Sequence, residues 1–111
     1  MNQLKNKIVV VTGASSGIGE ALALESYRHG ANVVMAARNI EKMEGILKKN
    51  NLQPSRSLLV KTDVTKPNEC KQLIEQTIET FGSIDVLINN AGVSMRANFL
   101  DCTFETLHQL M

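Results

Sequence analysis

The glycines of one short stretch are the residues whose spacing points most clearly to chemistry. The segment TGASSGIG, Thr12 to Gly19, puts three glycines into eight positions directly after the apolar run Ile8 to Val11. Such a stretch is either an ordinary tight turn or a place where a ligand comes closer to the backbone than a Cβ would allow. In the second case, free N–H groups at the start of a following helix would face an anion such as a phosphate.

The spacing of these glycines excludes one common phosphate-binding loop. A nucleoside-triphosphatase P-loop has Lys and then Ser or Thr after its last glycine, whereas Gly17 is followed by Ile18. The usual dinucleotide fingerprint is G-x-G-x-x-G, and the order here is G-x-x-x-G-x-G. In a dinucleotide site, Gly13 would permit the sharp exit from the strand, Gly17 the approach of a pyrophosphate, and Gly19 close packing of the helix.

The elements that would position this loop alternate between strands and helices. Residues 7–12 are expected to form a parallel strand covered on both faces, because the apolar run shows no polar alternation. A helix should run from Gly17 to about Gly30, with an apolar stripe of Ile18, Ala21, Leu22 and Leu24. Further strands are expected at 32–37, 57–62 and 84–89, helices at 40–50 and 67–81, a loop at 90–100, and another helical stripe from Phe104.

Capping signals support the middle helices. Asn39 is expected to be an N-cap, Pro67 suits a first helical position, and Gly82 should end the third helix. Strands that alternate with helices in this way predict a doubly wound parallel sheet of about four strands, with helices on both faces in three α/β/α layers. Ligands of such sheets bind outside the carboxyl ends of the strands, where the first strand-to-helix turn lies.

Composition excludes several classes of function. The 111 residues carry a formal net charge of +1, with no basic run beyond Lys48-Lys49, so charge gives no reason to expect binding to nucleic acid or to a membrane. No apolar run approaches the roughly 18 residues that span a bilayer, and a cytoplasmic location is expected. Cys70 and Cys102 lie far apart without nearby histidines, so no metal site is expected.

Three motifs taken together resemble the classical branch of the short-chain dehydrogenase/reductase family. TGASSGIG matches the T-G-x-x-x-G-x-G cofactor loop of that family, Asp63-Val64 matches its D-V after the third strand, and NNAG, Asn89 to Gly92, matches its fourth-strand motif. The motifs occur in family order and span nearly the whole chain. The resemblance implies a Rossmann-like fold and hydride transfer between a nicotinamide dinucleotide and a carbonyl or alcohol substrate.

The resemblance also implies which residues bind the cofactor. Asp63 would accept a hydrogen bond from the adenine amino group, Val64 would pack or bond beside that ring, and Asn90, Ala91 and Gly92 would follow the ribose. The loop candidates are Gly13, Ser15, Ser16, Gly17, Ile18 and Gly19. Two alternatives stay open, because Asp63 could instead be a turn acceptor before Thr65 and Asn89 could tie strands together.

Arg38 bears on the choice between NADP and NAD. An NAD site usually has a carboxylate at the end of the second strand, whereas a 2′-phosphate favours Arg. No carboxylate occurs from Met35 to Asn39, and Ser15 and Asn39 could supply further donors. We therefore expect NADP, although an exposed Arg that only covers the surface is the alternative. The second basic residue that the family often has inside its glycine loop is missing.

The catalytic residues that the family uses are not found in this chain. Its acid/base Tyr is followed four positions later by Lys, but the only tyrosine, Tyr27, is followed by Ala31 and is expected to pack. Ser94 lies too early to be the family's Ser. His29 and His108 are expected to be solvated. No catalytic residue is therefore assigned.

We expect residues 1–111 to be a single, truncated dinucleotide-binding domain that is inactive alone, with an open apolar edge at Val86 to Ile88. The full-length protein would be a homo-oligomeric oxidoreductase. The alternative is a dinucleotide-binding sensor or interaction module without catalysis.

Overall fold

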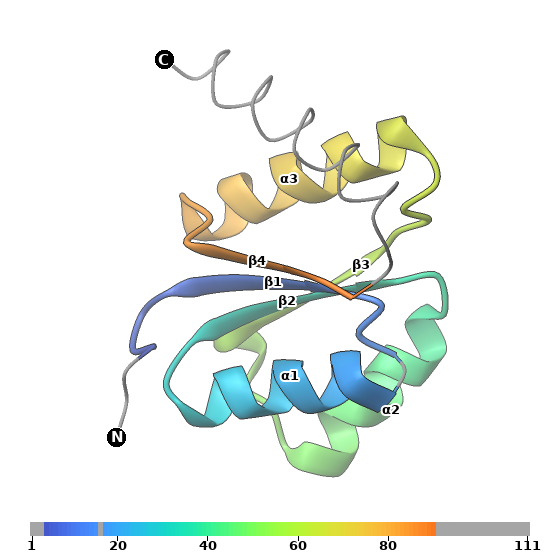
Figure 1. The fold of residues 1–111 in the computed structure, drawn as a ribbon. Coiled ribbons are helices and arrows are strands. Elements are labelled where there is room, and N and C mark those ends of the chain that lie inside the picture. Colours follow the sequence, from blue (N-terminus) through green and yellow to red (C-terminus); the bar gives the residue numbers. More distant parts are fainter. Residues whose placement is uncertain (1–3, 16, 91–111) are drawn as a thin grey trace.

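The computed structural model describes residues 4–15 and 17–90 (Figure 1). The described elements form a sheet of four parallel strands in the order β3-β2-β1-β4. This arrangement confirms the predicted doubly wound sheet. In chain order the elements are β1 Ile8–Thr12, α1 Gly17–Arg28, β2 Asn32–Ala37, α2 Ile40–Asn50, a 3-10 turn Pro54–Arg56, β3 Ser57–Lys61, α3 Pro67–Phe81 and β4 Val86–Asn89.

The first strand lies between two strands that are distant from each other in sequence. Val10 of β1 is in register with Val34 of β2 on one side and with Leu87 of β4 on the other. All five residues of β1 are buried. The run of β-branched residues therefore forms the interior of the sheet, as expected for a strand covered on both faces.

Helices cover both faces of the sheet, with α3 on one face and α1 and α2 on the other (Figure 1). Because side chains alternate along a strand, β1 serves both cores. Val10 packs with Leu73 and Ile74 of α3, while Val9 and Val11 belong to the cluster that includes the side chains of α1 and α2. These three layers are the predicted α/β/α arrangement.

The stripe predicted for α1 was wrong in part. Ile18 and Leu22 are 71% and 37% exposed, whereas the buried residues of the helix are Gly19, Ala23 and Ser26. These small residues recur at helical spacing and let the helix backbone lie close to the sheet. A search for large apolar side chains overlooks such a stripe.

The predicted capping residues of the other helices are confirmed. The Asn39 side chain accepts a hydrogen bond from the Lys42 N–H at the start of α2, and Gly82 ends α3 with φ 87°. Pro67 is the first residue of α3. The strands are slightly shorter than predicted, since β3 ends at Lys61 and β4 begins at Val86, and the 3-10 turn was not predicted.

In the part of the chain that the structure describes, no helix is long and apolar enough to cross a membrane, and no cluster of His, Cys, Asp or Glu could hold a metal ion. Cys70 is buried and forms no disulfide with another described residue. The expected loop at 90–100 beyond its first residue, the stripe from Phe104, and Ser94, Cys102 and His108 lie outside the described residues.

Candidate functional site

The loops that carry the predicted site residues meet at one edge of the sheet. The four strands are parallel, so their carboxyl ends lie at the same edge, followed by Gly13 after β1, Arg38 after β2, Asp63 after β3 and Asn90 after β4. Strand order reverses between β1 and β4, because β2 and β3 lie on one side of β1 and β4 lies on the other. This is where ligands of doubly wound folds bind.

Two of the three glycines in the loop are required by the backbone. Gly13 has φ 63°, a conformation that L-residues with a Cβ rarely adopt. A Cβ on Gly19 would overlap the carbonyl oxygen of Gly13 and lie 2.9 Å from Nδ2 of Asn90. The first turn of α1 therefore packs against the strand exit and against the residue after β4.

Gly17 has different surroundings. It is exposed at the first position of α1, and apart from its chain neighbours no described residue lies within 4 Å of a Cβ built there. Among the described residues, the space in front of it is open, as the approach of a bulky anion to the helix start requires. Ile18 is exposed beside it and Ser15 is half-buried; Ser16 lies outside the described residues.

Thr12 joins the glycine loop to the segment after β4. Its buried hydroxyl lies 3.2 Å from Oδ1 of Asn89 and 3.4 Å from the carbonyl oxygen of Ile88, and it accepts a hydrogen bond from the Asn90 N–H at 3.1 Å. Asn89 therefore contacts the neighbouring strand β1, as the interpretation that Asn89 ties strands together requires. No role was predicted for Thr12, although it is the first residue of the segment TGASSGIG.

Asp63 accepts two hydrogen bonds from Thr65, both at Oδ1. The Thr65 hydroxyl donates at 2.6 Å and the Thr65 N–H at 3.0 Å. These bonds lower the pKa of Asp63, with the hydroxyl contributing most, and the charges of Lys66 and Arg38 lower it further. Asp63 thus makes the turn contact that the alternative interpretation expected. Because its pKa is lowered, its carboxyl is charged at neutral pH.

The backbone of Asp63 is held by α3. Its N–H donates to Oε1 of Glu69 at 2.8 Å, and its carbonyl oxygen accepts from the Lys66 N–H at 3.0 Å. This contact of Glu69 was not predicted from the sequence. The only local signal for it is an acidic residue at the third position of a helix, which is common at helix starts.

The side chain of Val64 belongs to the core under α3 and is 9% exposed. It therefore has little surface left for packing against a ligand. Val64 was expected either to pack or to bond beside the adenine ring, and its burial leaves the hydrogen bond through its backbone as the contact it could make.

Arg38 follows β2 and is exposed. Asn39, next to it, uses Oδ1 to cap α2 through the Lys42 N–H at 3.0 Å. Arg38 therefore lies at the positive end of the α2 dipole. Lys61, in register with Ala37 on the neighbouring strand, is exposed as well. Arg38 and Lys61 thus place two cations after neighbouring strands, and the charge of Arg38 is close enough to Asp63 to lower the pKa of its carboxyl.

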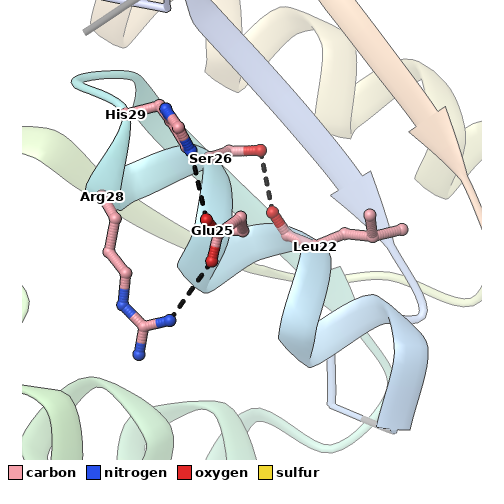
Figure 2. Close-up of polar contacts among 5 residues, drawn as sticks. All are labelled: Leu22, Glu25, Ser26, Arg28 and His29. Carbon is pink, nitrogen blue, oxygen red and sulfur yellow. Dashed lines mark hydrogen bonds and ion pairs between the residues drawn. The ribbon is translucent and has the colours of Figure 1, made fainter. Parts of the chain in front are cut away.

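His29, which was expected to be solvated, has a side chain that is 41% exposed at the end of α1. His29 lies 3.1 Å from Glu25, which also pairs with Arg28 at 3.3 Å on the outer surface of α1 (Figure 2). In the same figure the hydroxyl of Ser26 donates back to the carbonyl oxygen of Leu22. These groups belong to the far half of α1, away from its glycine-rich start, and exposed pairs of this kind contribute little to stability.

Tyr27 packs, as predicted. Its hydroxyl accepts a hydrogen bond from the Gln53 N–H at 3.0 Å, and the Arg56 guanidinium lies 4.0 Å from its ring centroid.

Comparison with known proteins identifies the family. Residues 7–111 match the family model of the short chain dehydrogenases. An uncharacterized oxidoreductase of Staphylococcus saprophyticus is 48% identical over 101 residues, which cover 91% of this chain and 40% of the relative. An uncharacterized oxidoreductase of Listeria innocua is 44% identical over 90 residues, covering 81% of this chain and 36% of the relative. The chain thus spans about two fifths of the length of these relatives.

Solved structures share the fold. A short chain dehydrogenase from Mycobacterium smegmatis superposes with a TM-score of 0.86 at 26% identity, covering 95% of this chain and 54% of that structure. A hydroxysteroid dehydrogenase from Escherichia coli superposes with a TM-score of 0.83 at 23% identity, covering 92% and 49%. Motifs, strand order and family match agree, and the chain belongs to the short-chain dehydrogenase family, whose membership implies an NAD(P) cofactor.

Proposed function

We propose that this chain binds NADP(H) at the carboxyl edge of its sheet and is the cofactor-binding part of an oxidoreductase. The observation that carries the proposal is the convergence of three loops at that edge. The glycine loop offers an open helix start at Gly17, Asp63 offers a charged carboxylate, and Arg38 offers a guanidinium. These groups suit a pyrophosphate, an adenine amino group and a 2′-phosphate, respectively.

The space in front of Gly17 supports a dinucleotide at the glycine loop. Among the described residues, a Cβ at Gly17 would extend into open space, and there the pyrophosphate would approach the N–H groups of the first turn of α1. Gly13 and Gly19 shape the loop from behind by allowing contact between the strand exit and the helix. Ser15, Ser16 and Ile18 remain candidate contacts of the loop.

At the other end of the site, Asp63 would accept from the adenine amino group. Oδ1 already accepts two hydrogen bonds from Thr65, so the other carboxylate oxygen is assigned to the adenine. Val64 would contribute its backbone only. Asn90 would follow the ribose, and the same role stays proposed for Ala91 and Gly92.

NADP is proposed over NAD because of the charge around Arg38. An NAD site would place a carboxylate after β2 to bind the ribose hydroxyls, and the segment from Met35 to Asn39 contains none. A 2′-phosphate beside Arg38 would also lie near the start of α2 and would be stabilised by its dipole. Asn39 could donate through Nδ2, because its Oδ1 is used by the helix cap.

The nicotinamide supplies hydride transfer when bound, and the proposed substrate is a carbonyl or an alcohol. This activity is proposed for the whole protein, as are its homo-oligomeric state and cytoplasmic location. Within the chain, the only tyrosine serves packing and no catalytic residue is assigned. A non-catalytic dinucleotide-binding module is the second candidate, favoured by the outer edge of β4, which pairs with no strand among the described residues.

The cofactor assignment is tested by titrating the protein and its Arg38→Ala variant with NADPH and with NADH. We expect the variant to bind NADPH about tenfold or more weakly, because one charge-assisted contact to the phosphate is lost, and to bind NADH unchanged. Arg28→Ala, which removes an exposed arginine of α1, is the matched control and should leave both affinities unchanged. Unchanged NADPH affinity in Arg38→Ala would defeat the assignment.

A further inference from the structure

Glu69 makes a contact that its position in the helix does not explain. It is the third residue of α3, where a glutamate commonly reaches back to the N–H of the N-cap residue. Here the N-cap is Lys66, and its N–H instead donates to the carbonyl oxygen of Asp63 at 3.0 Å. Oε1 of Glu69 extends farther back and accepts the N–H of Asp63 at 2.8 Å.

The backbone of Asp63 is therefore fixed on both sides of its Cα. Its N–H is bound by Glu69, and its carbonyl oxygen is bound by the start of α3. Two bonded backbone groups fix the direction of the Cα–Cβ bond, and Thr65 fixes one carboxylate oxygen. The side chain of Glu69 is 30% exposed, and its Oε2 lies 3.8 Å from Nζ of Lys66, which further restrains it.

We propose that Glu69 is a positioning residue for adenine recognition: it holds the backbone of Asp63 so that the carboxylate meets the exocyclic amino group of the adenine. The inference rests on the proposed function, in which Asp63 binds that group. Glu69 itself touches no part of the cofactor in this arrangement. Its effect should appear as selectivity for adenine, since a preorganised acceptor distinguishes a donor from an acceptor more sharply than a mobile one does.

The test compares two reduced cofactors that differ only at the base. One is NADPH, and the other is its deamino analogue, in which hypoxanthine presents a carbonyl oxygen where adenine presents an amino group. We expect the full chain to bind NADPH about tenfold or more tightly than the analogue, because the analogue replaces a charge-assisted hydrogen bond with two facing acceptors. The ratio of the two dissociation constants is the readout.

Two substitutions separate positioning from a merely structural role at the helix start. Glu69→Gln keeps the acceptor at the same reach and removes the charge, and we expect it to retain the ratio. Glu69→Asp keeps the charge in the first turn of α3 but shortens the side chain, and we expect the ratio to fall towards one. If Glu69 only stabilised the helix through its charge, Glu69→Asp would be tolerated better than Glu69→Gln.

Two further variants complete the design. Glu75→Ala, at an exposed position of the same helix, is the control and should leave the ratio unchanged. Asp63→Asn should abolish the preference, because its amide can donate to the hypoxanthine oxygen. Thermal unfolding verifies that each variant is folded. If Glu69→Asp does not fold, Glu69→Gln still tests the inference, because it retains the acceptor. Loss of the affinity ratio in Glu69→Gln would then overturn the inference.

The outcomes distinguish the two proposals. If the ratio is lost in Asp63→Asn but retained in Glu69→Asp, the positioning role is wrong and the adenine contact stands. If Asp63→Asn retains the ratio, the adenine contact is wrong and the role of Glu69 is overturned with it. Loss in Asp63→Asn and Glu69→Asp with retention in Glu69→Gln supports both.

Discussion

At the scale of single residues, the glycines of one loop have different roles although they share a motif. Gly19 is required because any side chain would overlap the backbone of Gly13, whereas the space around Gly17 is open among the described residues. Gly19 therefore serves the fold, and Gly17 is the glycine at which the proposed cofactor would approach the backbone. A motif written as letters gives them equal weight, and only the backbone path of the loop separates them.

This difference predicts opposite effects of the same substitution. We expect Gly19→Ala to lower the free energy of unfolding by about 1–3 kcal/mol, because the new Cβ forces the helix away from the strand exit. Gly17→Ala should leave stability within about 0.5 kcal/mol of the wild type or raise it slightly, since alanine favours the helix. Urea unfolding of both variants measures this. Equal destabilisation by the two substitutions would contradict the assignment.

Gly17→Ala should also separate the effect on cofactor binding from the effect on stability. Because the pyrophosphate is proposed to approach Gly17, Gly17→Ala should weaken NADPH binding while the fold is retained. Gly45→Ala on α2, where a Cβ also meets no described residue within 4 Å, is the matched control and should not change the affinity.

Asp63 predicts a pH dependence of stability. Its pKa is lower in the folded state than the ordinary value of 3.8, chiefly because the Thr65 hydroxyl donates to it. A lowered folded-state pKa means that the unfolded chain binds the proton more readily, so the contribution to stability is present above the ordinary pKa and is lost as the pH falls through the folded value. Thr65→Val should remove most of this contribution.

The measurement is urea unfolding of the wild type and Thr65→Val from pH 7 to pH 3. The difference between the two free energies should be largest near neutral pH and shrink below about pH 4. A difference that stays constant over this range would show that the hydroxyl acts through packing alone.

At the scale of elements, the loop before β3 is fastened to the end of α1. The Arg56 guanidinium lies over the ring of Tyr27 and donates to the carbonyl oxygens of Tyr27 at 2.7 Å and Ala31 at 2.9 Å. The Tyr27 hydroxyl accepts from the Gln53 N–H. One arginine thus joins α1, the start of β2 and the 3-10 turn.

We expect Arg56→Lys to destabilise the chain by about 1–2 kcal/mol, because an ammonium cannot bond both carbonyls and stack on the ring at once. Tyr27→Phe should cost about 0.5–1.5 kcal/mol through the lost acceptor. A double-mutant cycle by thermal unfolding measures their coupling. Arg28→Lys, at an exposed position of α1, is the control, and strict additivity of Arg56→Lys and Tyr27→Phe would contradict a shared cluster.

The sequence predicted most of the elements, and the exceptions have physical causes. Asn39, Pro67 and Gly82 mark helix ends through local backbone chemistry, and all three are confirmed. The buried stripe of α1 was missed because its members are small. The contact of Glu69 with the Asp63 N–H was missed because it depends on the path of the loop between them, which no local pattern encodes.

In the candidate site, too, the features set by local sequence could be predicted and the long-range contacts could not. Parallel strands place the loops after them at one edge, so the neighbourhood of Gly13, Arg38 and Asp63 could be expected from alternation alone. The link from the Thr12 hydroxyl to the end of β4 and the residue after it could not be expected, because it joins residues 76 to 78 positions apart.

At the scale of the whole molecule, stability should be uneven across the sheet. β1 is buried throughout and hydrogen-bonded on both sides, whereas every residue of β4 is only half-buried. Local opening should therefore begin at β4 and reach β1 last. Hydrogen exchange should find the amides of Val10 and Val11 slower than those of Leu87 and Ile88. Equal protection in the two strands would indicate a fully cooperative sheet.

The central place of β1 also has a consequence for biosynthesis. β2 and β3 leave the ribosome soon after β1 and can pair along one flank, but the other flank of β1 waits for β4, whose Val86 is its partner for Val9. At translation rates of about 5 to 20 residues per second, this wait lasts on the order of seconds. During that interval the unpaired backbone groups along this flank of β1 could pair with another chain, which makes the half-built sheet a client for chaperones that bind nascent chains.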